Sequence, residues 1–284
     1  MKRYLLGCLF LFSAVGEARP LPTIEQAQLR QQMLSQPRMA SGFDFEGVVG
    51  LSNCSGSIVR FSHSRPQDRA MVLTNGHCIG RFPAPGRAVV GVASSREFTV
   101  LSRDGLHTIG RIRADLLMYA TMTKTDMALY RLTSTYADIE QHFDVRALTL
   151  TEAGPDIGLG IQVLSGYWQR GYSCQVEKIV YQLKEGDWTN EESIRYSRPG
   201  CEVIGGTSGS PVVDPLNRTV VGVNNTGNES GDGCTENNPC EIDEAGNIEY
   251  QMGWSYAQQT AWIYSCVNSL GEMDLARTDC RLPH

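Results

Sequence analysis

The sequence lacks several features that would indicate particular functions. Its 284 residues carry a net charge of −6 and contain no block of Lys or Arg. Such a chain would repel nucleic acid, so we expect no DNA or RNA partner. The nine cysteines include no Cys-x-x-Cys pair, a spacing typical of zinc sites. We therefore expect no metal and no cofactor.

No apolar run is long enough to span a bilayer. Near the N-terminus, two basic residues precede about eleven mostly apolar residues (5–15) and then small residues. This pattern is typical of a cleavable secretory signal, which we place at residues 1–18. We expect a secreted protein, extracellular or periplasmic, with no membrane contact after cleavage. A rival interpretation is a lipoprotein anchor at Cys8, although almost no apolar stretch precedes that residue.

The remaining chain divides into two parts of different texture. Residues 19–45 contain a helix capping box at Thr23–Gln26 and form either a propeptide or an N-terminal arm that stays attached. Residues 46–284 show many short apolar segments bounded by Gly, Pro, Asn and Ser, a pattern that predicts an all-β barrel or sandwich. Residues 133–150 have few β signals and suit a crossing between two halves, near residue 140. The spacing of apolar residues over Ser255–Leu270 predicts a C-terminal helix.

Peptide hydrolysis by a serine requires a hydroxyl, a base, a group that orients the base, and donors for the oxyanion. His77 is the candidate base, because it ends a β segment and immediately precedes Cys78. A Cys54–Cys78 disulfide would fix the backbone that carries the imidazole, and closing a loop of this size contributes roughly 3 kcal/mol. Without that setting, a lone histidine is more often an ordinary surface or core residue.

An acid and a nucleophile occur in two further motifs. Asp126 enters the apolar segment 127–132, where it is either a simple strand cap or the partner of a histidine. Ser208 lies in Gly205-Gly206-Thr207-Ser208-Gly209-Ser210-Pro211, where glycines allow a sharp turn and close approach of a substrate. The N–H groups of Gly206 and Ser208 would then meet at an oxyanion. The pattern differs from the Gly-x-Ser-x-Gly motif of α/β-hydrolases, because Ser210 replaces the second glycine.

Together, these motifs make the chain resemble the chymotrypsin/trypsin-like serine peptidases, from about Gly47 to Gly271. The resemblance rests on the order His, Asp, Ser and on Thr-x-x-His-Cys, Asp-x-Ala-Leu and Gly-x-Ser-Gly-x-Pro. It implies two six-stranded antiparallel β-barrels, about 46–140 and 141–284, with a C-terminal helix. It also implies that His77 is the general base, Asp126 its orienter and Ser208 the nucleophile.

The resemblance also implies which residues contact substrate, and the sequence departs from the family's pattern near the nucleophile. Asn225, Thr226 and Gly227 fall on the strand that pairs with substrate in the family. Glu202 falls where trypsin-like members place the acid that selects Arg or Lys, and it is either that acid or a solvated loop carboxylate. Thr207 replaces the Asp that pairs with a freed N-terminal amine in animal zymogens, so we expect activation without that ion pair.

Removal of Cys8 with the signal leaves eight cysteines, an even number that suits disulfides in an oxidising compartment. Eight cysteines permit 105 pairings. Sequence proximity suggests Cys54–Cys78, Cys174–Cys201, Cys234–Cys240 and Cys266–Cys280.

The functional prediction is therefore a secreted, monomeric serine endopeptidase that acts on proteins or peptides through an acyl-enzyme. Two alternatives stay open at this point. One is an inactive homologue that uses the same scaffold for binding, and the other is an esterase on a different fold. The acidic stretch 232–249 is either a calcium loop or simply solvated, and the second interpretation is preferred.

Overall fold

The structure is a computed structural model that describes residues 42–268 and 271–284. The expected signal, residues 1–18, and most of the segment 19–45 lie outside the described residues. The end of that segment packs against the β domain, because the Phe45 side chain is fully buried in a core cluster. No described helix is long and apolar enough to cross a membrane.

The described residues fold mainly into strands. These are β1 Val48–Gly50, β2 Ser55–Arg60, β3 Arg69–Thr74, β4 Ala88–Ala93, β5 Glu97–Leu101, β6 Thr108–Thr121, β7 Met127–Thr135, β8 Leu148–Leu150, β9 Gly160–Ser165, β10 Arg170–Glu185, β11 Trp188–Tyr196, β12 Pro211–Asp214, β13 Thr219–Gly227, β14 Cys240–Ile242, β15 Ile248–Glu249 and β16 Ser255–Gln259. The helical elements are η1 Gly76–Ile79, α2 Tyr136–Phe143 and α3 Trp262–Ser265.

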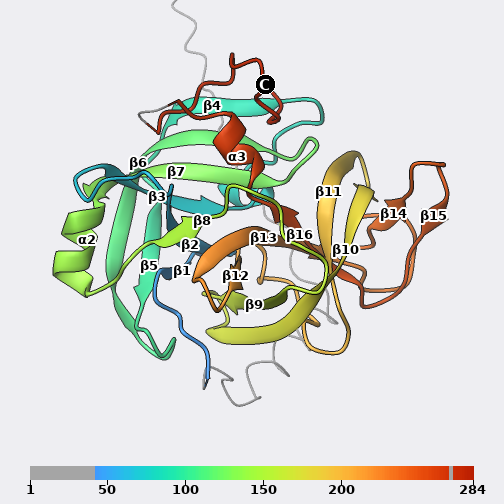
Figure 1. The fold of residues 1–284 in the computed structure, drawn as a ribbon, viewed down its shortest axis with the longest axis horizontal. Helices are drawn as coiled ribbons and strands as arrows, with labels where there is room; N and C mark the ends of the chain where they lie inside the picture. Colours follow the sequence, from blue (N-terminus) through green and yellow to red (C-terminus); the bar gives the residue numbers. More distant parts are fainter. Residues whose placement is uncertain (1–41, 269–270) are drawn as a thin grey trace, which may run out of the picture. The chain divides into compact units, whose positions relative to one another are not determined.

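The strands close into two rings of six antiparallel strands. The first ring runs β1-β2-β3-β7-β6-β5 and returns to β1, and the second runs β9-β10-β11-β16-β13-β12 and returns to β9. Strand β8 pairs in parallel with both β2 and β13 and so joins the two barrels (Figure 1). The expected all-β chymotrypsin-like fold of two six-stranded barrels is confirmed.

Adjacent residues of one strand enter different cores. In β3, Met71 and Leu73 belong to a cluster shared by both barrels, whereas Val72 belongs to the interior of the first barrel. Because side chains alternate across a strand, a strand buried on both faces needs apolar residues at consecutive positions. This explains the uninterrupted segment 70–73.

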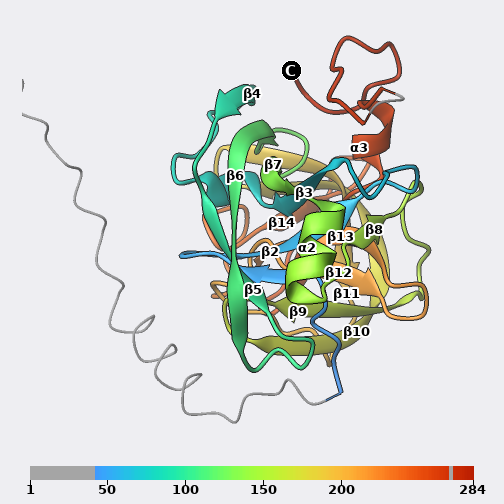
Figure 2. The same cartoon turned by 90° about the vertical axis from the view of Figure 1, so that its left-hand side faces the viewer.

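The crossing between the barrels contains α2, which lies on the outside of the first barrel (Figure 2). Thr135 caps its N-terminus in a capping box with Asp138, which satisfies two backbone N–H groups. The crossing then forms β8 and leads into the second barrel. The scarcity of strand signals over residues 133–150 in the sequence thus agrees with the capped helix that the structure shows there.

The helix expected over Ser255–Leu270 is wrong in its first part, and within the described residues of this range, 255–268, only α3 is helical. Ser255–Gln259 form β16, which pairs with both β11 and β13 and closes the second barrel. All five residues of β16 are buried. Closure of the barrel therefore outweighs the helical spacing of apolar residues in this segment.

Candidate active site

Strand pairing brings His77 and Asp126 together. Thr74 at the end of β3 pairs with Ala128 near the start of β7, so the η1 turn after β3 lies beside the residue that precedes β7. The His77 Nδ1 and Asp126 Oδ2 atoms are 2.6 Å apart, and Asp126 Oδ1 accepts the His77 backbone N–H at 3.1 Å. Because Nδ1–H faces the carboxylate, Nε2 of the neutral ring is an acceptor.

Burial and charge act in opposite directions on this pair. The Asp126 side chain is 4% exposed and the His77 side chain 22%. Burial lowers the pKa of His77, but the negative charge of Asp126 and its hydrogen bond outweigh this, with a further contribution from Glu185, so the pKa is raised above its ordinary value. Asn75 donates to the Asp126 carbonyl at 2.7 Å and fixes the backbone between the two motifs.

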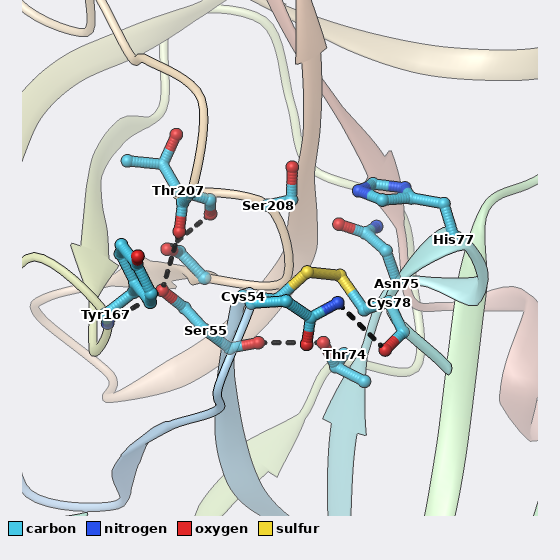
Figure 3. Close-up of a disulfide and its surroundings, with 12 residues drawn as sticks. Cys54, Ser55, Thr74, Asn75, His77, Cys78, Tyr167, Thr207 and Ser208 are labelled. Carbon is cyan, nitrogen blue, oxygen red and sulfur yellow. Dashed lines mark hydrogen bonds between the residues drawn. A yellow bond between two sulfur atoms is a disulfide. The ribbon is translucent and has the colours of Figure 1, made fainter. Parts of the chain in front are cut away.

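A disulfide holds the turn that carries the histidine. Cys78, one residue after His77, is bonded to Cys54, with their Cα atoms 6.1 Å apart. Figure 3 shows this bond below the His77 ring, with the Ser208 side chain also above it. The residue after the imidazole is thus tied to the start of β2.

The backbone of the Ser208 loop is anchored through its carbonyl groups. Trp168 Nε1 donates to Gly205 O at 2.9 Å, and Ser55 Oγ donates to Gly206 O at 3.4 Å. Ser210 donates to Thr207 O through its backbone N–H at 3.0 Å and its hydroxyl at 2.6 Å. The Ser55 N–H donates to Ser208 O at 2.8 Å.

These anchors determine where two N–H groups point. In a trans peptide, the N–H points opposite to the preceding carbonyl. The Gly206 N–H therefore faces away from Trp168, and the Ser208 N–H faces away from Ser210. Neither N–H has a hydrogen-bond acceptor among residues 42–268 and 271–284. Two free backbone donors in one loop are able to receive an oxyanion.

Two glycines make this loop conformation accessible. Gly206 has φ +91° and Gly209 has φ +82°, where other residues are strained. A Cβ at Gly209 would also lie 2.1 Å from the carbonyl oxygen of Ser55. The glycines of the motif are thus required by backbone shape and by contact with β2.

The Ser208 hydroxyl donates to the carbonyl of Asn225, at 3.2 Å. Within the described part of the chain, no hydrogen bond joins Ser208 to His77. Catalytic hydrogen bonds are often formed only when substrate is bound, so this geometry agrees with a nucleophile at rest.

The other residues predicted to contact substrate lie in different settings. Asn225 is buried and Thr226 half-buried in β13, and both line a cavity beside His77; Gly227 ends the strand. Glu202 is exposed, and its carboxylate accepts the Gly200 N–H of its own loop at 3.0 Å. Glu202 does not line that cavity.

Thr207 is buried and bonded within its own turn. Its N–H donates to Ile204 O at 3.0 Å, and its hydroxyl donates to the same oxygen. The described residues contain four disulfides, which are the four pairs suggested by sequence proximity: Cys54–Cys78, Cys174–Cys201, Cys234–Cys240 and Cys266–Cys280.

Two residues of this region were not predicted from the sequence. Trp168 anchors the Ser208 loop, and Glu185 lines the cavity beside His77. Glu185 ends β10 and pairs with Trp188 of β11, a hairpin that no motif marks. The two-residue turn Gly186-Asp187 was the available signal for that hairpin.

Comparison with known proteins agrees with this arrangement. A family model described as a trypsin-like peptidase domain matches residues 54–223, more than half of the chain. The chain belongs to the trypsin-like peptidase family. The matched region contains His77, Asp126 and Ser208.

Individual relatives of this trypsin-like peptidase are distant. The pro-apoptotic serine protease NMA111 of Yarrowia lipolytica is 27% identical over 195 residues, which cover 68% of this chain but 17% of that protein. The MamO protease domain of Magnetospirillum magneticum is 15% identical, with 80% of this chain and 99% of that chain covered and a TM-score of 0.48. The active form of the Rv3671c protease of M. tuberculosis is 16% identical, with 98% and 97% covered and a TM-score of 0.45.

Proposed function

We propose that the chain is a serine endopeptidase in which Ser208 attacks the peptide carbonyl. Its proton passes to His77 Nε2, while Asp126 holds Nδ1–H and stabilises the imidazolium that forms. The carbonyl oxygen becomes an oxyanion that accepts from the N–H groups of Gly206 and Ser208. When the intermediate collapses, the C–N bond breaks and His77 gives its proton to the leaving amine.

The second half of the reaction releases the acyl group. A water molecule transfers a proton to His77 Nε2 and attacks the ester carbon on Ser208. Collapse of this second intermediate breaks the bond to Ser208 Oγ, which recovers its proton from His77. No cofactor is needed, because every proton and electron pair is supplied by these residues, the peptide and water.

The observation that carries this proposal is the pair of unoccupied N–H groups in the Ser208 loop. A structural turn would satisfy its backbone donors internally. Here, four anchored carbonyls leave the Gly206 and Ser208 donors free beside the hydroxyl. The raised pKa of the nearby imidazole, which burial alone would lower, agrees with a base that is stabilised as it becomes charged.

Labelling with a fluorophosphonate tests the proposal. We expect stoichiometric modification of Ser208 in the folded protein and none in Ser208→Ala. His77→Ala should react far more slowly, because the hydroxyl has lost its base. Absence of labelling in protein with all four disulfides formed would contradict the proposal.

A second candidate is a non-catalytic homologue that binds peptides. The observation that favours it is the hydrogen bond from the Ser208 hydroxyl to Asn225 rather than to His77. Peptide binding without labelling of Ser208 would support this alternative. Activity on small esters but never on denatured protein would instead indicate an esterase.

We also propose that the protein is exported and acts as a monomer on extracellular or periplasmic proteins. Four disulfides favour an oxidising compartment. Fractionation of expressing cells, with N-terminal sequencing of the product, tests both export and the cleavage site near residue 18. Retention of residues 1–18 in the cytosolic fraction would contradict export.

A further inference from the structure

A cavity of about 120 Å³ opens beside His77, on the side formed by the β10–β11 hairpin. It has no role in the proton transfers described above. Its walls come from that hairpin, from β13 and from the segment after η1. A cavity of this size holds far more than one water molecule, which needs roughly 10–15 Å³ by the same measure. It therefore has room for part of a substrate side chain.

The charged groups that line this cavity are, apart from His77, all carboxylates. Glu185 is half-buried, and its Oε1 accepts the Asn237 N–H at 2.8 Å. Asn190 is 4% exposed, and its Oδ1 is buried without a hydrogen-bond partner among the described residues. Glu236 adds a second carboxylate, and no Lys or Arg lines the described cavity wall. A cavity that offers hydrogen-bond acceptors but no Lys or Arg suits a ligand whose polar group only donates hydrogen bonds, as an ammonium or a guanidinium does.

Two aromatic rings add a second feature that favours a cation. Phe82 and Trp188 line the cavity, with their ring centroids 6.1 Å apart and the planes nearly perpendicular. Trp188 is held by its indole N–H, which donates to Pro83 O at 3.3 Å. Aromatic faces attract ammonium and guanidinium groups through the ring quadrupole.

The hairpin fixes the carboxylate in place. Glu185 and Trp188 are cross-strand partners at the end of the hairpin, so one short turn positions both the charge and an aromatic wall. Burial raises the pKa of Glu185, and hydrogen bonds from Thr226 and Asn237 only partly offset this. The negative charge of Asp126 also raises it, and His77 lowers it. A bound cation would favour the carboxylate form.

We propose that this cavity binds the side chain of Arg or Lys from the substrate, with Glu185 as the residue that determines the preference. The inference rests on the proposed peptidase function. Because Asn225 accepts from Ser208 and the chain continues into Thr226, the cavity lies along the strand expected to pair with substrate. The bound residue therefore lies on the amino-terminal side of the scissile bond.

Paired peptides that differ only in charge test this site. Fluorogenic peptides carry Arg or its neutral isostere citrulline at each of the three positions before the scissile bond. At one position, we expect kcat/KM to be at least about tenfold higher for Arg, because a hydrogen-bonded charge pair is lost with citrulline. Glu185→Gln should reduce this ratio to near one.

The control is Glu244→Gln, which removes one negative charge from an exposed loop and should keep the ratio of the wild type. Equal kcat/KM for the paired peptides at every position, or an Arg preference that survives in Glu185→Gln, would overturn the inference. Glu185→Asp, which keeps the charge, should retain part of the preference for Arg. That result would attribute the loss of preference in Glu185→Gln to the missing charge rather than to misfolding.

Equilibrium binding of the same peptides to Ser208→Ala separates this inference from the proposed function. Fluorescence anisotropy should give a lower Kd for the Arg peptide, and the difference should vanish in Ser208→Ala/Glu185→Gln. If no peptide is cleaved but this difference is found, the catalytic proposal fails and the cation site stands. If peptides are cleaved but neither Kd nor kcat/KM differs between the Arg and citrulline peptides, the cation-site inference is refuted and the catalytic proposal stands.

Discussion

Replacement of Trp168 by Phe tests whether the loop anchor positions the oxyanion donors. The substitution keeps most of the ring and removes the indole N–H that donates to Gly205 O at 2.9 Å. A neutral hydrogen bond contributes about 1 kcal/mol, which corresponds to a factor of about five in an equilibrium. The Gly205–Gly206 peptide should then turn its N–H away from the oxyanion position in a larger fraction of molecules.

The structure sets limits on the size of this effect. Ser55 still donates to Gly206 O at 3.4 Å, so the loop keeps one of its two anchors next to the glycines. Complete loss of one oxyanion donor costs about 10²–10³ in kcat. We therefore expect a decrease of about fivefold in kcat, well below that limit, with little change in KM.

Steady-state kinetics with the preferred peptide substrate provide the assay. A peptidyl trifluoromethyl ketone, whose adduct with Ser208 carries the oxyanion, should lose affinity by the same factor as kcat/KM. Binding of uncleaved peptide to a Trp168→Phe/Ser208→Ala double variant should be unaffected. An increase in KM with unchanged kcat would refute the reasoning, because it would place Trp168 in substrate binding instead.

Four further outcomes follow from the contacts of the site. Activity requires neutral His77, so it should fall as pH decreases through the pKa of that residue. Glu185→Gln removes a negative charge that raises this pKa. The acidic limb of the kcat/KM profile should therefore move to lower pH in this variant. Asp126→Asn should move the limb in the same direction and also lower kcat strongly. Thr207→Asp should bring no gain in activity and should reduce the melting temperature, because it buries a carboxylate at a position that is 1% exposed; activation that depends on a freed N-terminal amine would contradict this. Ser55→Ala leaves the Tyr167 N–H without its acceptor at 3.1 Å, so urea unfolding should show a loss of about 1–3 kcal/mol, and an unchanged midpoint would contradict that role.

The sequence was informative where chemistry restricts the choice of residue. The glycines around Ser208 occur where positive φ and contact with β2 exclude a side chain, and such positions are readable as a motif. The doubly buried strands of the first barrel appear as uninterrupted apolar segments for the same reason. Both features are local, and each leaves a local trace in the sequence.

Features that depend on contacts between distant segments were not predictable in this way. Ser255–Gln259 begin a segment whose apolar residues have helical spacing, yet they close a barrel with strands about 30 and 60 residues earlier in the chain. Glu185 is a strand-end carboxylate in the sequence and becomes a cavity wall only because the hairpin reaches His77. Trp168 similarly acquires its role by meeting a loop 37 residues away.

One short segment connects the two halves of the candidate site. Cys54 is bonded to Cys78, which follows the proposed base, and the adjacent Ser55 donates to the carbonyls of Gly206 and Ser208. Any shift of this segment would therefore move the base and the nucleophile loop together. Since the proposed base belongs to the first barrel and the proposed nucleophile to the second, such a shared anchor fixes the separation between them. Precise placement of reacting groups is what proton transfer requires, and a joint anchor at residues 54 and 55 supplies it without a bond between Ser208 and His77.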